Sequence, residues 1–334
     1  FILSIVFGFI YRRSLLAVDH YARKCQEAFY RQWAKAVSPR RVGSLQPPEI
    51  YTSLESFRCN VVITDYTDYE ALVHEAIATE NNADYFEVRD THCFSHSSTS
   101  KKFIPFTKSV ISGFKCYQNV VISHLLHAQP LTQLKTYVFL SGLAVEKRGS
   151  RSLGYSSAVM MERNTKFLKS LVNPSVSLLT LNDFDEKLLM LEQRFIDTRP
   201  DTLSGIPEMT KGLLLHFLDG ARADEIKSIL KGVVLYCWSG NYLTKEDEAF
   251  FRTYCSPELV IYDFCSATEG SIGFSVGRYG VFAPALQHNL FLYVDSCGER
   301  FFSWELEVGK RYLLTMTNYS GLTAYKTGDR VDVL

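Results

Sequence analysis

The sequence predicts an α/β protein in which parallel and mixed sheets are covered by helices, followed by a β-rich C-terminal part. The first observation is an apolar helical segment over 213–218 that precedes an apolar run over 233–238, interpreted as a buried strand. The second is the capping-box spacing of Thr244 and Asp247, which opens a helix before a further apolar strand over 259–262. Short apolar strands that alternate with helices are typical of such sheets.

The third observation is a change of pattern after Gly270. Residues 290–294 and 312–317 alternate in the manner of antiparallel strands. The sequence shows no internal repeat and no long linker. We therefore expect the C-terminal part to be built mainly from strands.

The N-terminal half divides into shorter elements. Apolar residues at helical spacing predict a helix within 13–37, and prolines end this pattern at Pro39 and Pro47. The elements predicted after it are a strand over 61–64, helices over 69–78 and 107–127, a strand over 136–140, a small-residue loop over 149–157 and a helix over 185–196.

Composition excludes several classes of protein. The 334 residues are 46% hydrophobic and 22% charged, which is ordinary for a soluble globular protein. Lysine plus arginine and aspartate plus glutamate number 36 each, so the whole chain lacks the basic excess of a nucleic-acid-binding protein. The eight cysteines are scattered, with no C-x-x-C pair, which favours free thiols in a reducing cytoplasm over disulfides or a zinc site.

The first residues of the chain are apolar, from Phe1 to Ile10, and Arg12 and Arg13 follow them. A membrane span needs about 20 apolar residues, so we expect none here. A buried first helix is the favoured interpretation. The end of a truncated membrane or signal segment is the alternative.

A hydroxyl-rich cluster, Ser97–Ser100, precedes Lys101 and Lys102. Hydroxyl and backbone N–H groups are the donors that phosphate oxygens need, and a hydrogen bond to a charged group contributes roughly 1.5–3 kcal/mol. The cluster therefore suggests phosphate binding, and a solvated polar turn is the alternative. The sequence contains no G-x-x-x-x-G-K-[ST] phosphate loop.

Two acidic residues follow apolar segments further along. Glu269 lies in a segment after the strand over 259–262, and ligands of open α/β sheets collect outside the carboxyl ends of strands. A carboxylate there is a candidate ligand for Mg²⁺, which prefers oxygen donors and shares them with phosphates. Asp329 follows Gly328, and a carboxylate can accept both hydrogen bonds of the ribose diol. The alternatives are a capping acid and a hairpin-turn acid. Together with the hydroxyl cluster, the two carboxylates suggest one site for a nucleotide triphosphate.

With these motifs, the chain resembles the auxin-responsive Gretchen Hagen family of acyl-acid amido synthetases, within the adenylate-forming superfamily. The resemblance covers nearly the whole chain. Its most specific part is the segment Thr317 to Leu322, which runs on through Tyr325 to Asp329. The other matching segments are the helix within 12–33, 63–69, 97–105, 203–207, 238–241 and 267–270.

The resemblance implies that residues 1–334 form the large N-terminal domain of an adenylate-forming enzyme. An N-terminal helix would occupy about 1–37, and residues 90–334 would build the nucleotide and acyl site. The family's small C-terminal domain is absent from this sequence. The implied reaction is ATP-dependent activation of a carboxylic acid as an acyl-adenylate, followed by transfer to an amine such as an amino acid, in the cytoplasm. The acid, the acceptor and the oligomeric state stay open.

The resemblance also implies roles for individual residues. Glu269 and Thr268 would be catalytic, and Glu269 would be the ligand of Mg²⁺. ATP and Mg²⁺ are the expected cofactors. The expected nucleotide-binding residues are Ser97, Ser98, Thr99, Ser100, Ser239, Gly240, Ala267, Thr268, Tyr319 and Asp329.

Two positions depart from the family pattern. Ser98 stands in place of a glycine, within a shortened loop, and Ala324 stands in place of an arginine. Glycine permits positive φ and a close backbone approach to phosphate. A degenerate homologue that binds a ligand or partner without catalysis is therefore one alternative. An acyl-CoA ligase, which keeps the first half-reaction and changes the acceptor, is another.

Overall fold

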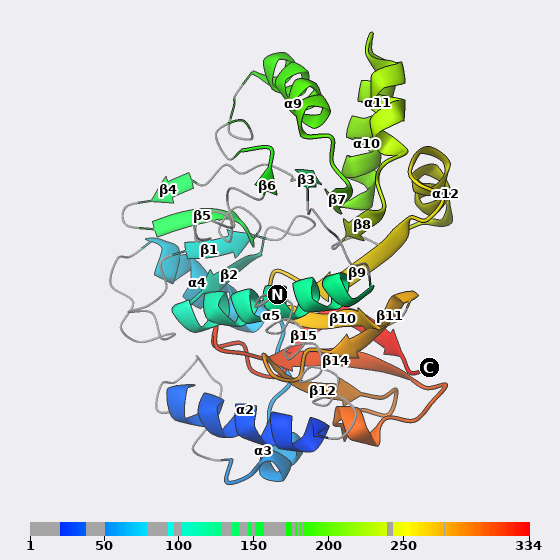
Figure 1. The fold of residues 1–334 in the computed structure, drawn as a ribbon. Helices are drawn as coiled ribbons and strands as arrows, with labels where there is room; N and C mark the ends of the chain where they lie inside the picture. Colours follow the sequence, from blue (N-terminus) through cyan, green and yellow to red (C-terminus); the bar gives the residue numbers. More distant parts are fainter. Residues whose placement is uncertain are drawn as a thin grey trace, which may run out of the picture.

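The computed structural model describes residues 21–37, 51–78, 93–96, 102–128, 135–139, 146–148, 151–156, 172–175, 178, 181, 183–238, 243–276 and 278–334. Within these residues the chain forms three sheets flanked by helices (Figure 1). The apolar stretch from Phe1 to Ile10 lies outside the described residues. Among the described helices, none is both long and apolar enough to cross a membrane.

The central sheet has seven strands in the order β11-β10-β9-β8-β7-β3-β6. The strands from β6 to β9 are parallel, and β10 and β11 continue the sheet antiparallel. The carboxyl ends of β3, β7, β8 and β9 therefore meet at one edge. The strand bounds are β3 Thr136–Phe139, β6 Val172–Asn173, β7 Thr202–Gly205, β8 Leu235–Trp238, β9 Val260–Ser266, β10 Ser271–Val276 and β11 Arg278–Pro284.

Helices cover both faces of this sheet, as the sequence predicts. Along β8, Tyr236 packs in the cluster with helices α9 to α12, whereas Leu235 and Cys237 pack with Tyr117 and Val121 of α5. Successive side chains of a strand point to opposite faces, so one short apolar run serves both layers. The helix bounds are α5 Lys108–Ala128, α9 Phe184–Thr198, α10 Pro207–Leu218, α11 Ala223–Leu230 and α12 Lys245–Tyr254.

Helix α12 begins where the sequence predicts. The Thr244 hydroxyl accepts the Asp247 N–H at 3.1 Å, and the Asp247 carboxylate accepts the Thr244 N–H at 3.3 Å. Lys211 of α10 reaches the same carboxylate, with its Nζ 3.0 Å from Asp247 Oδ1. The capping box is thus confirmed, and it also ties α12 to α10.

The second sheet has four strands in the order β2-β1-β5-β4. Helix α4 (Thr67–Ala78) packs on it through Tyr69 and Val73, which cluster with Phe94 and Leu153. The antiparallel strands β1 and β2 pair His96 with Phe103, and these two ends flank the hydroxyl cluster. The strand bounds are β1 Cys93–His96, β2 Phe103–Phe106, β4 Glu146–Arg148 and β5 Arg151–Tyr155.

Two local predictions are wrong. The predicted strand over 61–64 is reduced to a single bridge from Thr64 to Tyr325, because Val61 is the C-cap of helix α3 (Leu54–Asn60). The loop predicted over 149–157 contains strand β5, which pairs with both β1 and β4. Both segments owe their structure to distant partners.

The third sheet confirms the β-rich C-terminal part. Its order is β13-β12-β14-β15, and β12 pairs antiparallel with β14, as predicted for 290–294 and 312–317. The bounds are β12 Leu290–Val294, β13 Arg300–Phe301, β14 Arg311–Thr317 and β15 Tyr325–Asp332, with a short 3₁₀ helix, η3, at Ser303–Glu305.

Two N-terminal helices, α2 (Ala22–Val37) and α3 (Leu54–Asn60), cover one face of this sheet (Figure 1). Trp33 is fully buried, and its Nε1 donates to the carbonyl of Asn318 at 3.1 Å. The Gln26 side-chain amide donates to the carbonyls of Leu286 and Asn289 at 2.7 and 2.8 Å. Helices α2 and α3 therefore share one core with the C-terminal sheet.

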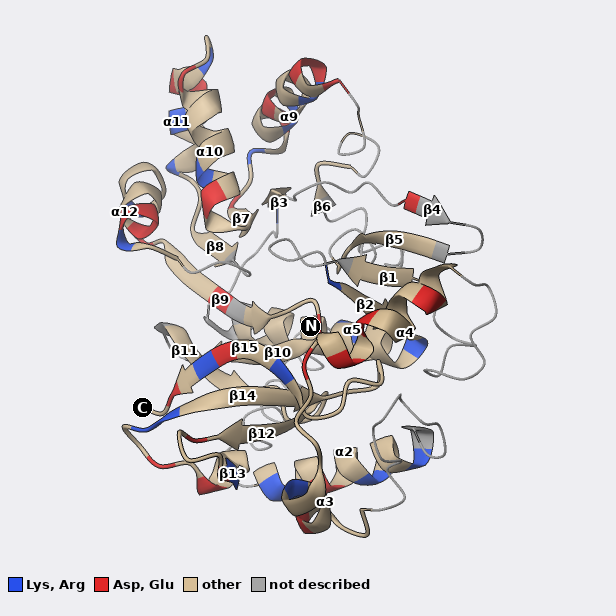
Figure 2. Cartoon of the chain, turned by 180° about the vertical axis from the view of Figure 1, so that it is seen from behind, with Lys and Arg blue, Asp and Glu red and all other residues tan. Residues whose placement is uncertain are grey.

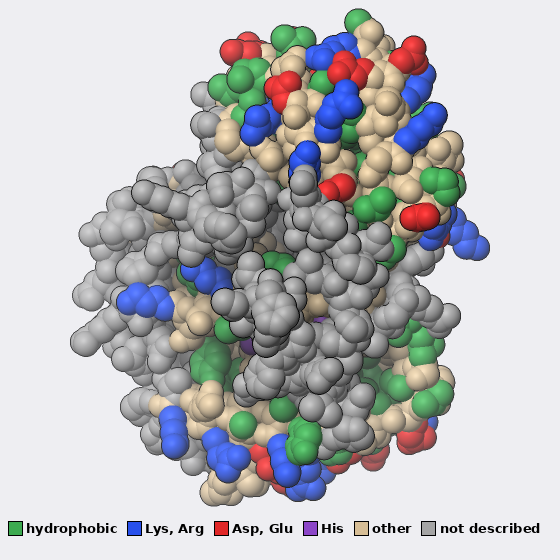
Figure 3. All heavy atoms as spheres, viewed as in Figure 1, with side chains coloured by type: hydrophobic (Ala, Val, Ile, Leu, Met, Phe, Trp, Pro, Cys, Tyr) green, Lys and Arg blue, Asp and Glu red, His purple; other side chains and the backbone are tan. Residues whose placement is uncertain are grey.

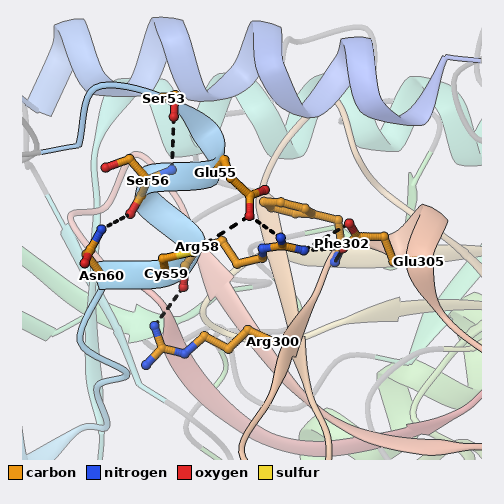
Figure 4. A network of polar contacts seen from close by, with 9 residues as sticks. All are labelled: Ser53, Glu55, Ser56, Arg58, Cys59, Asn60, Arg300, Phe302 and Glu305. Atoms are coloured by element: carbon orange, nitrogen blue, oxygen red, sulfur yellow. Dashed lines mark hydrogen bonds and ion pairs between the residues drawn. The ribbon is translucent and has the colours of Figure 1, made fainter.

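Two arginines, Arg58 and Arg300, connect α3 to the segment around β13 (Figure 4). The Arg58 guanidinium lies 2.8 Å from Glu305 Oε2 and 5.4 Å from the ring of Phe302. Arg300 Nη1 donates to the carbonyls of Arg58 and Val61, each at 2.8 Å. A cation at the last carbonyls of a helix is favourable because those groups have no partner inside the helix.

Strand β9 carries a buried carboxylate. Asp263 is fully buried; its Oδ2 accepts the N–H of Gly280 at 2.7 Å, and its Oδ1 has no hydrogen-bond partner among the described residues. Burial raises the pKa of Asp263, and hydrogen bonds from Gly280 and Ser275 partly offset this.

We expect Trp33→Phe to lower the free energy of unfolding by about 2–3 kcal/mol, because it shrinks a buried ring and leaves the Asn318 carbonyl without its donor. Trp304 is a matched control, since it is only partly buried and stacks on Phe302 at 4.8 Å. Trp304→Phe should cost less than about 1.5 kcal/mol. Urea unfolding measures both variants, and equal losses would contradict the assigned role of Trp33.

Asp263→Asn should stabilise the protein near neutral pH. Because the folded-state pKa of Asp263 is raised, the folded state holds this proton to higher pH than the unfolded state. Stability is therefore lost as pH rises from the ordinary value of 3.8 through the raised value. The asparagine removes this loss, so the gain should be about 1 kcal/mol near neutral pH and should disappear in acid. Unfolding midpoints against pH test it, and a gain that is constant with pH would refute it.

Candidate functional site

The turn between β9 and β10 places Glu269 beside the carboxyl edge of the central sheet. Ala267 and Gly270 close the turn through two backbone hydrogen bonds of 2.9 and 3.2 Å, and Thr268 and Glu269 form its tip. A Cβ on Gly270 would lie 3.1 Å from Met316 Sδ and 3.2 Å from Asn289 Oδ1, so only glycine fits without displacement. The turn is therefore held against the C-terminal sheet, and Glu269 is only 7% exposed.

Glu269 meets two residues from other segments. The hydroxyl of Tyr325, the first residue of β15, donates to Glu269 Oε1 at 3.2 Å. Lys102 precedes β2 and donates from Nζ to the same hydroxyl at 3.4 Å. Its Nζ also lies 5.8 Å from the ring centroid of Tyr66 and 5.9 Å from that of Tyr325. A lysine, a tyrosine and a carboxylate from three distant segments thus form one cluster.

The charge of Glu269 is only partly compensated. Burial raises the pKa of Glu269, the Lys102 ammonium and the Tyr325 hydroxyl lower it, and the negative charge of Asp329 raises it again. Burial and the adjacent Glu269 likewise raise the pKa of Tyr325, which keeps the phenol protonated as a donor. A bound cation would relieve the cost of this buried carboxylate.

Asp329 lies on the exposed side of β15. Its N–H donates to Thr327 Oγ1 at 3.2 Å, and Gly328 before it has a φ of 91°. Burial is the largest cause of the raised pKa of both Glu269 and Cys265, and the charge of Asp329 raises both pKa values further. The two carboxylates that the sequence singles out therefore interact electrostatically.

Two further positions that the sequence singles out, Tyr319 and Ala324, are at least partly buried. The ring of Tyr319 packs against Phe29 at a centroid distance of 5.0 Å, and its carbonyl accepts the Thr107 hydroxyl at 3.1 Å. Ala324, at the position of the family's arginine, is buried and has a φ of 43°. The predicted residues that lie outside the described part of the chain are Ser97, Ser98, Thr99, Ser100, Ser239 and Gly240.

Asn318 is a site-forming residue that the sequence did not single out by itself. Its side-chain Nδ2 donates to the carbonyl of Glu269 at 2.6 Å, and its Oδ1 accepts the N–H of Ser320 at 2.9 Å. Its own carbonyl accepts the Trp33 indole N–H. Asn318 lies inside the most specific sequence motif, and its place in that motif was the signal in the sequence that could have identified it. Tyr325, in the same motif, is the second such residue.

A metal at this edge would rest on few protein ligands. The described part of the chain holds no group of three or more His, Cys, Asp or Glu side chains arranged to bind a metal ion. This fits Mg²⁺, which is commonly bound by one or two carboxylates together with substrate phosphates and water. Glu269, buried and under-compensated, is the described residue that suits this role.

A separate cavity of about 470 Å³ lies between β3, α9 and α10. Its lining is mainly apolar and includes Phe139, Leu191 and Leu213, with Lys187 and His216 as polar members. The cavity lies beside β3, and β7 and β8 separate that strand from β9, which precedes the Glu269 turn. Its volume is in the range of about 300–1,000 Å³ that is typical of small-molecule pockets.

Known proteins give two kinds of match. The family model for the GH3 family N-terminal domain matches residues 19–191, and that for the GH3 family central domain matches residues 289–334. The sequence matches no curated protein.

Solved structures share the fold at low sequence identity. AtGH3.15 acyl acid amido synthetase in complex with 2,4-DB superposes with a TM-score of 0.79 at 11% identity, covering 98% of this chain and 68% of that one. A second structure of GH3.15 acyl acid amido synthetase gives 0.74 at 12% identity, with 95% and 66% covered. An open conformation of 2-hydroxyisobutyryl-CoA ligase with 2-HIB-AMP and CoA gives 0.59 at 14% identity, with 98% and 69% covered. The chain thus spans about two thirds of the length of these proteins.

The N-terminal family model alone covers more than half of the chain, and the central-domain model covers the segment that carries Asn318, Tyr325 and Asp329. The structural matches extend the shared fold over nearly all of it. The structural matches confirm the predicted α/β fold, which is that of adenylate-forming enzymes. The family models confirm the family inferred from the motifs: the chain belongs to the GH3 family.

Proposed function

We propose that this chain is the acid-activating domain of an ATP-dependent acyl-acid amido synthetase. The observation that supports this most directly is the cluster of Lys102, Tyr325 and Glu269, with Asp329 near enough to act electrostatically on Glu269. The cluster offers an ammonium for phosphate, a buried carboxylate for a cation and an exposed carboxylate for a ribose diol. Membership of the GH3 family and the fold shared with acyl acid amido synthetases support the same chemistry.

The reaction would consist of two transfers. In the first, an oxygen of the substrate carboxylate attacks the α-phosphorus of ATP, the bond from that phosphorus to the bridging oxygen breaks, and pyrophosphate leaves. In the second, an amine attacks the acyl carbon of the adenylate, loses a proton, and AMP leaves. Mg²⁺, when bound, would neutralise phosphate charge. The protein acts mainly by positioning the reactants and compensating charge.

Each site residue then has a proposed role. Ser97–Ser100 and Lys102 would hold the phosphates, and Thr268 and Glu269 would serve the phosphates and Mg²⁺. Asp329 would accept the ribose hydroxyls. The nucleotide would also contact Ala267, Tyr319, Ser239 and Gly240.

The apolar cavity is the proposed site for the apolar part of the acid. It is lined by β3, α9 and α10 of the parallel part of the central sheet, and ligands of such sheets collect near the carboxyl ends of their strands. Its phenylalanine and leucine side chains suit a hydrocarbon or aromatic group. The acceptor would be an amine or amino acid, and neither nucleic acid nor a membrane is proposed as a partner.

The distribution of charge and the cysteines support a cytoplasmic enzyme with small-molecule substrates. Basic and acidic side chains are interspersed over α9, α10 and α11 (Figure 3) and along β15 (Figure 2), which differs from the basic surface of a nucleic-acid-binding protein. None of the eight cysteines forms a disulfide, as suits a reducing compartment.

An acyl-CoA ligase is the second candidate, because the fold is also shared with 2-hydroxyisobutyryl-CoA ligase. Pyrophosphate exchange on the full-length protein, with a panel of carboxylic acids, tests the first transfer. Analysis of products with amino acids or CoA then separates amide from thioester formation. Absence of exchange with every acid, together with absence of ATP binding, would support a non-catalytic homologue with the altered Ser98 loop.

We expect Asp329→Ala to weaken ATP binding by about 1.5–3 kcal/mol, the contribution of hydrogen bonds to a charged acceptor. The residue is exposed, so the fold should be retained. Calorimetry with ATP and Mg²⁺ measures the effect. Asp332→Ala is a matched control at the end of the same strand, where Asp332 pairs with Arg311. Equal affinities in the Asp329 variant and the parent would contradict the ribose assignment.

Filling the cavity should exclude large acids. A Cβ on Gly212 of α10 would meet no atom within 4 Å, so Gly212→Phe can be introduced and its ring occupies cavity space. We expect the KM of the preferred apolar acid to rise at least about tenfold while that of ATP changes little. Gly212→Ala is the control, and it should stabilise the helix by about 0.5–1 kcal/mol. An unchanged KM for the acid would place its site elsewhere.

A further inference from the structure

Tyr325 joins residues from three segments that are distant in the sequence. It begins β15, four residues before Asp329, and its hydroxyl lies between Glu269 after β9 and Lys102 before β2. The residue is fully buried. A buried hydroxyl is tolerated only when it is hydrogen-bonded, so its two polar partners explain why it can stay there.

The two contacts have a defined direction. The Tyr325 hydroxyl donates its single hydrogen to Glu269 Oε1 and accepts from Lys102 Nζ. The hydroxyl therefore binds one oxygen of the Glu269 carboxylate and restrains the direction in which the carboxylate points. A carboxylate has a second oxygen with which it can bind a cation.

The backbone around Tyr325 is held on both sides. The neighbouring Thr64 forms a parallel bridge with it, and the Lys326 N–H donates to the Thr64 carbonyl at 2.8 Å. On the carboxylate side, Asn318 fixes the Glu269 carbonyl at 2.6 Å. With both backbones fixed, the 3.2 Å contact restrains the orientation of the Glu269 side chain.

We propose that Tyr325 is a positioning residue that orients the Glu269 carboxylate toward a divalent cation bound with the nucleotide phosphates, and links that carboxylate to Lys102. This inference rests on the proposed function, since it assigns the cation to the nucleotide site. Tyr325 itself touches neither nucleotide nor acid in this scheme. Its effect should therefore be confined to the part of nucleotide binding that depends on the cation.

The test compares ATP affinity in the presence of Mg²⁺ and in the presence of a chelator, by calorimetry on the full-length protein. In the parent, Mg²⁺ should tighten ATP binding. Tyr325→Phe should reduce this Mg²⁺-dependent gain by about tenfold, the effect of losing one hydrogen bond to a charged group, and should leave the affinity without Mg²⁺ within about twofold. An unchanged Mg²⁺ gain in the variant would overturn the proposal.

Tyr69→Phe is the matched control. Tyr69 is also fully buried, its ring lies 6.1 Å from that of Tyr325, and its hydroxyl bonds Thr64 and the Thr323 N–H rather than Glu269. Removal of the Tyr69 hydroxyl should lower the melting temperature. It should leave unchanged the ratio of the ATP affinity with Mg²⁺ to the ATP affinity with a chelator. A ratio that falls equally in both variants would indicate a general structural effect and would overturn the positioning role.

A second measurement needs no nucleotide. Urea unfolding of Tyr325→Phe, Glu269→Gln and the double variant forms a cycle that reports the coupling between the two side chains. We expect non-additive shifts in the unfolding midpoint, and additive shifts would overturn the contact. If the parent binds no ATP, the proposed function and the cation role fall together, whereas the cycle still decides whether Tyr325 holds Glu269.

Discussion

The hydrogen bonds of Asn318 hold helix α2, the C-terminal sheet and the candidate site in one arrangement. Its carbonyl accepts from Trp33 of α2, and its side chain binds the Glu269 carbonyl on one side and Ser320 on the other. All of these contacts are buried, where an unmade hydrogen bond costs more than it would at the surface. The turn that carries Glu269 is thus fixed by the N-terminal helix as well as by the two strands that flank it.

This rigidity matters because the site holds an incompletely neutralised charge. A flexible turn would let Glu269 swing into water and lower the cost of its ionisation. Here Gly270 is confined by Met316 and Asn289, and Glu269 stays buried. The fold therefore maintains a carboxylate in a costly environment, and this preorganisation is what the proposed cation role requires.

The sequence predicted the elements whose signals are local. The capping box at Thr244, the apolar runs of the central sheet and the alternation of β12 and β14 each depend on neighbouring residues. The family and the carboxylates of the site followed from short motifs. The cluster of Lys102, Tyr325 and Glu269 could not be predicted from short motifs. Its contacts join Tyr325 to Glu269, 56 positions away, and to Lys102, 223 positions away. The strand predicted over 61–64 was wrong and strand β5 was missed for the same reason, since pairing partners rather than local propensity define both segments.

The contact between Trp33 and Asn318 spans 285 positions. During synthesis at about 5–20 residues per second, Trp33 would therefore emerge roughly 15–60 s before Asn318 exists. For most of that interval the apolar side of α2 has none of its partners from β12, and chaperones or premature aggregation compete for it. Order at the candidate site is thereby tied to synthesis of the third sheet: a ribosome that stalls before this sheet leaves both helix α2 and the Glu269 turn without the residues that organise them.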